Sequence, residues 1–188
     1  MKLILIRHGL TEANEKHLYC GSTDIPLSCA GIDALKKKRD EGTLPDITGL
    51  RVITSGMKRC GETLALLFGD IEHETDTDFR EMDFGVFEMR SYDEMKDDPQ
   101  YIEWISGDNE VNIAPGGESG NIMTARVIRG LGRLTDDGRG ALVVTHGGVI
   151  AAIMAYLFPG EGKNRYEWQP GAGGGYEIDT DAGTYRRF

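Results

Sequence analysis

Two short, continuous apolar runs in this chain both end in a histidine followed by a glycine. Leu3–Ile6 leads through one arginine to His8, and Ala141–Thr145 leads directly to His146. Unbroken runs of β-branched and apolar residues are typical of strands buried on both faces, as in parallel sheets covered by helices. The glycine allows a sharp turn and leaves the imidazole uncovered. We therefore expect an α/β protein that presents two histidines at strand ends.

The rest of the chain alternates between strand and helix patterns. Pro99 is expected to interrupt one helix, and the loop 115–119 opens another that reaches Leu134. Such alternation predicts a three-layer α/β/α sandwich with a mostly parallel central sheet. The length of 188 residues suits a single domain, 1–188. The remaining strands are predicted over 50–55, 71–76, 176–179 and 184–188, and the other helices over 28–41, 58–68, 92–106 and 149–157.

Composition excludes several classes of function. The formal net charge of −10 would repel a nucleic-acid backbone, and no apolar run approaches the roughly 20 residues of a membrane span. The first residues lack the pattern of a secretion signal, so we expect a cytoplasmic protein. Cys20, Cys29 and Cys60 lack the spacing of a disulfide framework or a zinc site, and are predicted to be free thiols.

Cationic side chains accompany the two histidines. Arg7 stands beside His8, and Arg59 lies in the first turn of the predicted helix 58–68. In parallel sheets the crevice beyond the carboxyl ends of the strands binds ligands, so neighbouring strands would bring both imidazoles together. Two guanidiniums and two imidazoles form a receptor for a tetrahedral dianion, which would hold a phosphoryl group without a metal ion.

Two other interpretations of these residues stay open. A metal site needs three or four ligands, and no cysteine, aspartate or further histidine lies near either histidine in the sequence. Alternatively, the strands merely end in polar residues and Arg59 is an exposed helix residue.

On these residues the chain resembles the histidine phosphatase superfamily, whose fold is phosphoglycerate-mutase-like. The resemblance extends over nearly the whole chain, and its blocks follow one another in the family's order. They are Arg7-His8-Gly9 with Thr11, Glu12 and Asn14, then Gly21, Asp24, 26–28 and Gly31, then 55–63, Arg80-Glu81, Phe84-Gly85, 117–119 and 144–148.

The resemblance implies a role for each matching residue. His8 would be the nucleophile that forms a phosphohistidine, and Glu81 would be the general acid and base. The phosphoryl oxygens would be held by Arg7, Asn14, Arg59 and His146. Secondary contacts are expected from Cys20, Gly21, Thr23 and Gly147. No cofactor and no metal are implied.

Two positions depart from the family pattern, and one assignment depends on it. Cys20 stands where some members have a hydroxyl or amide side chain, and Met89 stands where members often have glycine. Glu81 is selected by the pattern alone, because the same stretch holds other carboxylates, Glu88 among them, that are expected to be solvated. Trp104, Tyr92 and Tyr101 either pack in the core or on the surface, or line the leaving-group pocket.

The chain most resembles the small phosphatase branches, the α-ribazole phosphatases of cobalamin synthesis in particular. We therefore expect a metal-independent phosphomonoester hydrolase acting on α-ribazole 5'-phosphate or another small phosphomonoester. A cofactor-dependent phosphoglycerate mutase and a non-catalytic phosphoryl-binding domain are the alternatives. The expected partner is a small phosphorylated metabolite, with no nucleic acid and no membrane, and a homodimer is compatible with the sequence.

Overall fold

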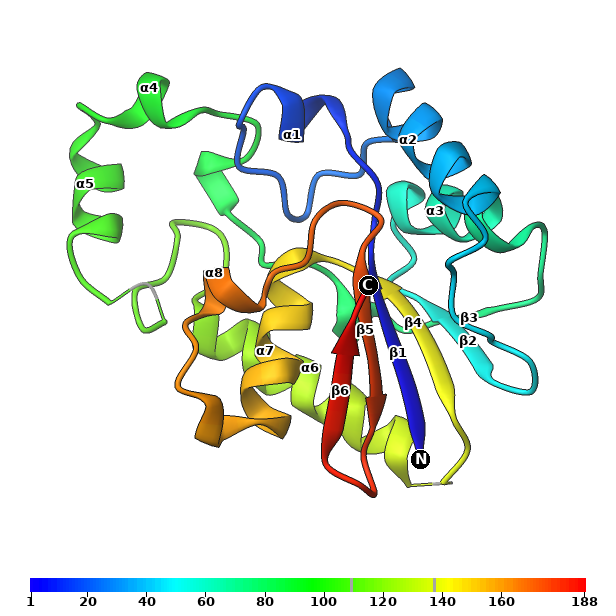
Figure 1. Cartoon of the computed structure of the whole chain (residues 1–188). Helices are drawn as coiled ribbons and strands as arrows, with labels where there is room; N and C mark the ends of the chain where they lie inside the picture. Colours follow the sequence, from blue (N-terminus) through cyan, green and yellow to red (C-terminus); the bar gives the residue numbers. More distant parts are fainter. Residues whose placement is uncertain (109, 137) are drawn as a thin grey trace.

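The computed structural model describes residues 1–108, 110–136 and 138–188, which form a six-stranded sheet between two layers of helices (Figure 1). The strands lie in the order β3-β2-β4-β1-β5-β6. Their bounds are β1 Lys2–Arg7, β2 Arg51–Thr54, β3 Glu74–Thr75, β4 Ala141–Thr145, β5 Gly175–Asp179 and β6 Thr184–Arg187.

The predicted mostly parallel sheet is confirmed. β3, β2, β4 and β1 run parallel, whereas β5 and β6 are antiparallel additions at the β1 edge. β1 and β4 are neighbours, and Arg7 pairs with Thr145 at the end of their register. The amide of His8 donates to the carbonyl of Thr145 at 2.9 Å. The two strands therefore end side by side, with the histidines one residue beyond.

Helices cover both faces of the sheet because the central strands are apolar on both. Ile4 and Ile6 of β1 pack with α2 (Cys29–Asp40) and α3 (Lys58–Phe68). Leu3 and Leu5, which point the opposite way, pack with α6 (Gly120–Thr135) and α7 (Gly147–Leu157). All four side chains have no exposed surface. Burying each of these side chains stabilises the fold by about 1.5–3 kcal/mol. Their packing on both faces of β1 holds the sheet between its two layers of helices.

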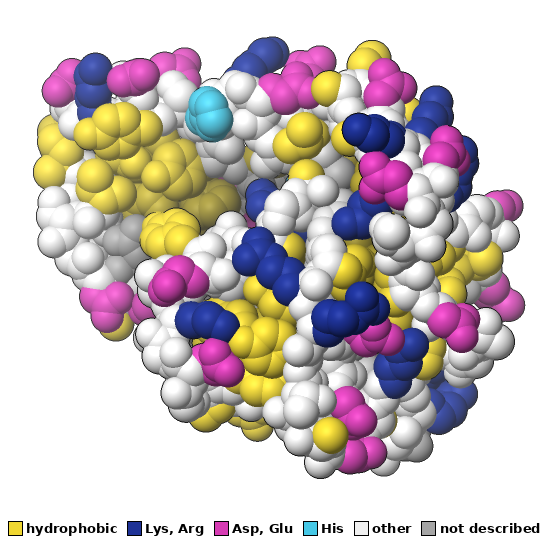
Figure 2. All heavy atoms as spheres, in the orientation of Figure 1, with side chains coloured by type: hydrophobic (Ala, Val, Ile, Leu, Met, Phe, Trp, Pro, Cys, Tyr) yellow, Lys and Arg dark blue, Asp and Glu magenta, His cyan; other side chains and the backbone are white. Residues whose placement is uncertain are grey.

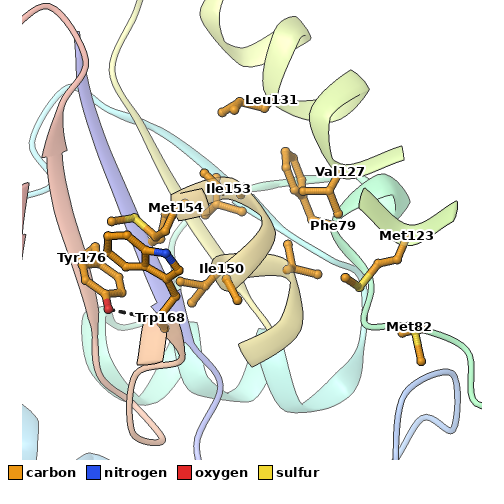
Figure 3. Packing of buried hydrophobic residues seen from close by; sticks show 14 of the residues in the cluster. Phe79, Met82, Met123, Val127, Leu131, Ile150, Ile153, Met154, Trp168 and Tyr176 are labelled. Carbon is orange, nitrogen blue, oxygen red and sulfur yellow. Dashed lines mark hydrogen bonds between the residues drawn. The ribbon is translucent and has the colours of Figure 1, made fainter. Parts of the chain in front are cut away.

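The core on the α6 and α7 face continues beyond the sheet (Figure 3). Trp168 packs on Tyr176 of β5, whose hydroxyl donates to the Trp168 carbonyl at 3.0 Å. At the other end of this cluster, Phe79 and Met82 pack against residues of α6 such as Val127. The core thus fixes the backbone on both sides of Glu81.

Short helices surround the end of the sheet at which β1 and β4 finish (Figure 1). The predicted break at Pro99 is confirmed, since Pro99 begins α5. The structure corrects the sequence-based expectations at three elements. Helices α1 and α8 were not predicted, because four residues carry no apolar period, and β3 is shorter than the predicted 71–76, where 72–74 are exposed. The bounds are α1 Glu12–Glu15, α4 Tyr92–Met95, α5 Pro99–Ile105 and α8 Arg165–Trp168, with 3-10 turns η1 Thr77–Phe79, η2 Gly85–Phe87 and η3 Pro159–Glu161.

Two features of composition are visible in the fold. The three cysteines are free thiols, as predicted, and only Cys60 is fully buried. Among the described residues, no helix has the length and apolar character that a bilayer crossing requires.

Candidate active site

His8 lies at the floor of a cavity with its protonation state set by its surroundings. Its Nδ1 is 2.7 Å from the Gly9 carbonyl, which can only accept, so Nδ1 carries the proton and Nε2 keeps its lone pair. The side chain is buried, with 6% of its surface exposed. Burial, and secondarily the charge of Arg59, lowers the pKa of His8 to about 3. The imidazole is therefore neutral at physiological pH, with a free lone pair on Nε2.

Arg7 and Asn14 line the same cavity as His8. Arg7 donates through Nη1 to the Pro170 carbonyl at 2.9 Å, and its buried Nε has no hydrogen-bond partner among the described residues. Asn14 caps its own helix: its Oδ1 accepts from the amide and the hydroxyl of Thr11, each at 3.1 Å. The amide nitrogen of Asn14 then remains as a donor, so both residues offer N–H groups to an anion.

Arg59 is buried beneath this cavity, with 1% of its surface exposed, and does not line it. Its Nη1 and Nη2 donate to the carbonyls of Thr23 and Gly21 at 2.8 and 2.7 Å, and its Nε donates to His146 Nδ1 at 3.4 Å. Three of its five N–H groups are thereby used, which fixes the plane of the guanidinium. The exposed-helix alternative for Arg59 is excluded.

His146 completes the floor from the N-terminus of α7, and it too is buried beneath the cavity. Because Arg59 can only donate, Nδ1 of His146 accepts and Nε2 donates to Ser55 Oγ at 2.9 Å. The ring centroids of His146 and His8 are 5.1 Å apart. Burial, followed by the nearby His8 and Arg59, holds the pKa of His146 well below its ordinary value.

Glu81 is the carboxylate that lines the cavity beside His8. Its Oε2 accepts from the Gly148 amide at 2.9 Å and its Oε1 from the Met82 amide at 3.0 Å. A Cβ on Gly148 would lie only 2.4 Å from Glu81 Oε1, so a larger residue here would displace the carboxylate. The structure thus separates Glu81 from nearby carboxylates such as Asp76 and Asp78, which pair with Arg133 on α6.

The secondary residues occupy two different places. Cys20 and Gly147 line the cavity, whereas Gly21 and Thr23 act through the carbonyls that hold Arg59. Cys20 Sγ donates to the Thr23 carbonyl at 3.6 Å. A Cβ on Gly21 would collide with the Met82 carbonyl at 1.6 Å, so glycine is required for the close approach of this loop to the Glu81 segment.

Glu88 organises that loop, and the expectation that it is merely solvated is wrong. Its carboxylate accepts from the backbone amides of Gly21, Ser22, Thr23 and Phe84 at 2.9–3.2 Å, and from the Thr23 hydroxyl at 2.6 Å. The residues it holds are those whose carbonyls hold Arg59. No local sequence signal marks this role, because the donors lie more than 60 residues away for all but Phe84.

The cavity has a volume of about 240 Å³ and an aromatic far side. Trp104 lines it, whereas Tyr101 is core and Tyr92 is 57% exposed outside it. Hydrophobic side chains gather over α4 and α5 on this side of the molecule (Figure 2). Besides the residues above, the cavity is lined by Leu18, Tyr19, Met82, Phe84, Gly148, Arg165, Tyr166 and Gln169.

Arg165 is the one further cationic side chain among the described residues that line the cavity, and it was not predicted from the sequence. It lies on α8 and its Nη1 is 2.9 Å from Glu110 Oε1. Its charge is thus already balanced by a carboxylate from the segment between α5 and α6. Across the described parts of the chain, no cluster of three or more His, Cys, Asp or Glu side chains is arranged to hold a metal ion.

This fold and this arrangement of histidines agree with a family model. The histidine phosphatase superfamily (branch 1) matches residues 3–186. The chain therefore belongs to the histidine phosphatase superfamily, and it is an enzyme of the phosphatase type found there.

The known relatives carry the names of two activities. The adenosylcobalamin/α-ribazole phosphatase of Escherichia coli (strain K12) is 30% identical over 194 residues, which cover 99% of this chain and 94% of the relative. The crystal structure of the α-ribazole phosphatase from Shigella flexneri superposes with a TM-score of 0.85 at 29% identity, covering 100% and 95% of the two chains. A phosphoglycerate mutase from Thermus thermophilus has a TM-score of 0.73 at 29% identity, covering 95% and 93%. The fold is shared by both activities, so the site must distinguish them.

Proposed function

We propose that the protein hydrolyses phosphomonoesters through a phosphohistidine on His8, without requiring a metal ion. The observation that carries the proposal is the fixed tautomer of His8, whose Nδ1 is bound to the Gly9 carbonyl while burial keeps the ring neutral. The free lone pair on Nε2 is the nucleophile. Arg7 and Asn14, which line the cavity, supply donors for the phosphoryl oxygens, while Arg59, buried beneath it and held on one side by His146, adds its positive charge.

The first step transfers the phosphoryl group to the enzyme. Nε2 of His8 forms a bond to phosphorus as the bond between phosphorus and the ester oxygen breaks. Glu81, acting as the general acid, gives a proton to the departing alkoxide, which leaves as the alcohol. The guanidiniums of Arg7 and Arg59 offset the negative charge on the transferred group.

The second step returns the enzyme to its starting state. Glu81 is now a carboxylate and takes a proton from a water molecule whose oxygen attacks phosphorus. The bond between phosphorus and Nε2 breaks, inorganic phosphate forms, and His8 is neutral again. One carboxyl group can serve both steps because Glu81 lines the same cavity as His8.

The far side of the cavity supports an uncharged, partly aromatic leaving group. Tyr19, Phe84, Trp104 and Tyr166 line it, and the charge of Arg165 is balanced by Glu110. A second anionic group on the substrate, as in phosphoglycerates, would have to compete with Glu110 for that arginine. We therefore favour α-ribazole 5'-phosphate, a nucleotide with an uncharged planar base, which is also the substrate type in the names of the Escherichia coli and Shigella relatives. We expect the enzyme to act on it in the cytoplasm.

Substrate preference tests this proposal. The kcat/KM for α-ribazole 5'-phosphate is expected to exceed that for 3-phosphoglycerate by at least about tenfold, which corresponds to roughly 1.4 kcal/mol of transition-state binding. Activity should persist in the presence of a chelator. Mutase turnover of 3-phosphoglycerate far above hydrolysis would contradict the proposal, and so would loss of activity with the chelator. Binding of phosphate with no turnover of any ester would favour a non-catalytic domain.

A further inference from the structure

The backbone around Glu81 is held by a single side chain of α6, Arg126. Its Nη1 donates to the carbonyls of Asp78 and Arg80 at 2.9 and 2.6 Å, and its Nη2 donates to the carbonyl of Glu81 at 2.8 Å. These three carbonyls belong to the segment that ends at the cavity. Arg126 therefore binds the main chain of the acid/base residue directly, and it does not itself line the cavity.

Glu118 holds Arg126 in place and also binds the main chain on the other side of Glu81, at Asp83. The two oxygens of Glu118 accept from Nε and Nη2 of Arg126 at 2.9 and 2.8 Å, a bidentate pair with 15% and 20% of the side chains exposed. The carboxylate of Glu118 also accepts from the amide of Asp83 at 3.1 Å, and its own amide donates to the Asp83 carbonyl at 2.8 Å. Positions 78, 80, 81 and 83 are thus tied to one ion pair.

The core completes this support. Phe79 and Met82 flank the tied carbonyls and are 0% and 4% exposed, and they belong to the cluster that includes Val127 of α6 (Figure 3). On the substrate side, the carboxylate of Glu81 accepts from the amide of Gly148. The main chain of Glu81 is therefore set by α6, while its side chain is set by α7.

We propose that Arg126, together with Glu118, is a positioning residue that aims the carboxyl group of Glu81 at the leaving oxygen of the substrate. The proposal rests on the proposed function, in which Glu81 is the general acid. Correctly placed general acids contribute about 10²–10⁴-fold in rate, and a displacement of about 1 Å can cost about 10²-fold. A lysine cannot replace the fork of Arg126, because its single ammonium cannot bind a carboxylate bidentately and three carbonyls together.

The test compares two leaving groups in the Arg126→Gln variant. An alkyl phosphate needs a proton on its leaving oxygen, whereas the phenolate of p-nitrophenyl phosphate leaves without one. The quantity measured is kcat/KM, which covers the steps through departure of the alcohol. We expect Arg126→Gln to reduce kcat/KM for the alkyl phosphate about 10–100-fold more than for p-nitrophenyl phosphate. Arg126→Lys should show the same selective loss.

Arg129→Gln is the matched control. Arg129 lies one turn further along α6 and donates only to the side chain of Asp78, at 3.1 and 2.6 Å. The Arg129→Gln substitution removes the same charge from the same helix without affecting a contact to the main chain of Glu81. The ratio of the two kcat/KM values should stay at that of the unmodified protein. If Arg126→Gln fails to fold, Glu118→Gln retains the Arg126 side chain but weakens the bidentate pair that fixes it, and should produce the selective loss in the same direction.

The outcomes separate this proposal from the function on which it rests. An equal loss on both substrates in Arg126→Gln would mean that the residue only stabilises the fold, and would overturn the positioning role. The Glu81→Gln variant distinguishes an error in the positioning role of Arg126 from an error in the general-acid role of Glu81. If Glu81→Gln shows the selective loss and the Arg126 and Glu118 variants do not, only the positioning role is wrong. If Glu81→Gln itself shows no selectivity, Glu81 is not the general acid and the proposed mechanism is wrong as well.

Discussion

The imidazoles of His8 and His146 lie edge to face, with their planes inclined at 65°. Each ring has one nitrogen whose state is dictated by a partner that can act in only one way, the Gly9 carbonyl for His8 and the guanidinium of Arg59 for His146. Burial above all, with the nearby charge of Arg59 adding to it, holds the pKa of each ring below its ordinary value. The pair is therefore neutral in the folded protein.

This neutrality makes stability depend on pH. An unfolded histidine binds a proton near pH 6.5, whereas folded His8 does so only near pH 3, so the unfolded state binds more protons between these values. The contribution of His8 to the free energy of unfolding therefore has its full value above pH 6.5 and decreases as the pH is lowered. For His8 the expected loss between pH 6.5 and about 5 is about 2 kcal/mol, measured by urea unfolding.

The His8→Asn variant should lose less stability over the same pH range, because its side chain no longer titrates. His17→Asn is the control, since His17 is exposed and its backbone has φ of 54°, a conformation that asparagine tolerates. An unchanged slope in His8→Asn would contradict the neutral, buried state of His8.

Removing the charge of Glu88 should weaken phosphoryl binding at a distance. In Glu88→Gln, an amide NH₂ replaces one of the oxygens that accept from the loop 21–23, so the carbonyls that hold Arg59 lose their support. The expected result is about a tenfold or greater rise in the inhibition constant for inorganic phosphate, with a loss of about 1–3 kcal/mol in stability. Asp93→Asn, an exposed carboxylate on α4, is the control. An unchanged constant would show that the loop does not depend on Glu88.

Met89 carries backbone strain that glycine would relieve. Its φ is 58°, in the left-handed region, and its amide donates to the Tyr19 carbonyl at 2.7 Å. The loop therefore keeps the shape that the family pattern assigns to glycine. Met89→Gly is expected to stabilise the protein by about 0.5–1 kcal/mol in thermal or urea unfolding, whereas Met89→Ala, which retains a Cβ, should not. Equal effects of the two variants would exclude backbone strain as the cause.

Apolar runs and turn residues in the sequence predicted the strands and longer helices that such short patterns specify. The helix 58–68 matches α3 at both ends, and the strands that lead to His8 and His146 are neighbours, which is the condition for bringing the two imidazoles together. Apolar runs and glycines carry these signals, because a buried strand and a sharp turn each require particular residues in sequence. Helix α8 was missed because its four residues show no period, although Trp168 within it is a core residue.

The support of the site could not be predicted, because its partners are far apart in the chain. Glu88 binds a loop more than 60 residues away, and Arg126 binds carbonyls about 45 residues away. Carboxylates in the stretch 74–88 look alike in sequence. Only the folded arrangement shows that Glu81 lines the cavity, Asp78 pairs with α6 and Glu88 holds the loop.

Trapping of the phosphoenzyme tests the central claim most directly. The protein is mixed with a radiolabelled phosphomonoester, quenched at alkaline pH, digested and mapped. We predict one labelled peptide, with the phosphoryl group on His8, in a linkage that survives alkali and is lost in acid, and no label in His8→Ala. An active protein whose label lies on another residue, or one that turns over substrate with no label at all under rapid quenching, would contradict the account.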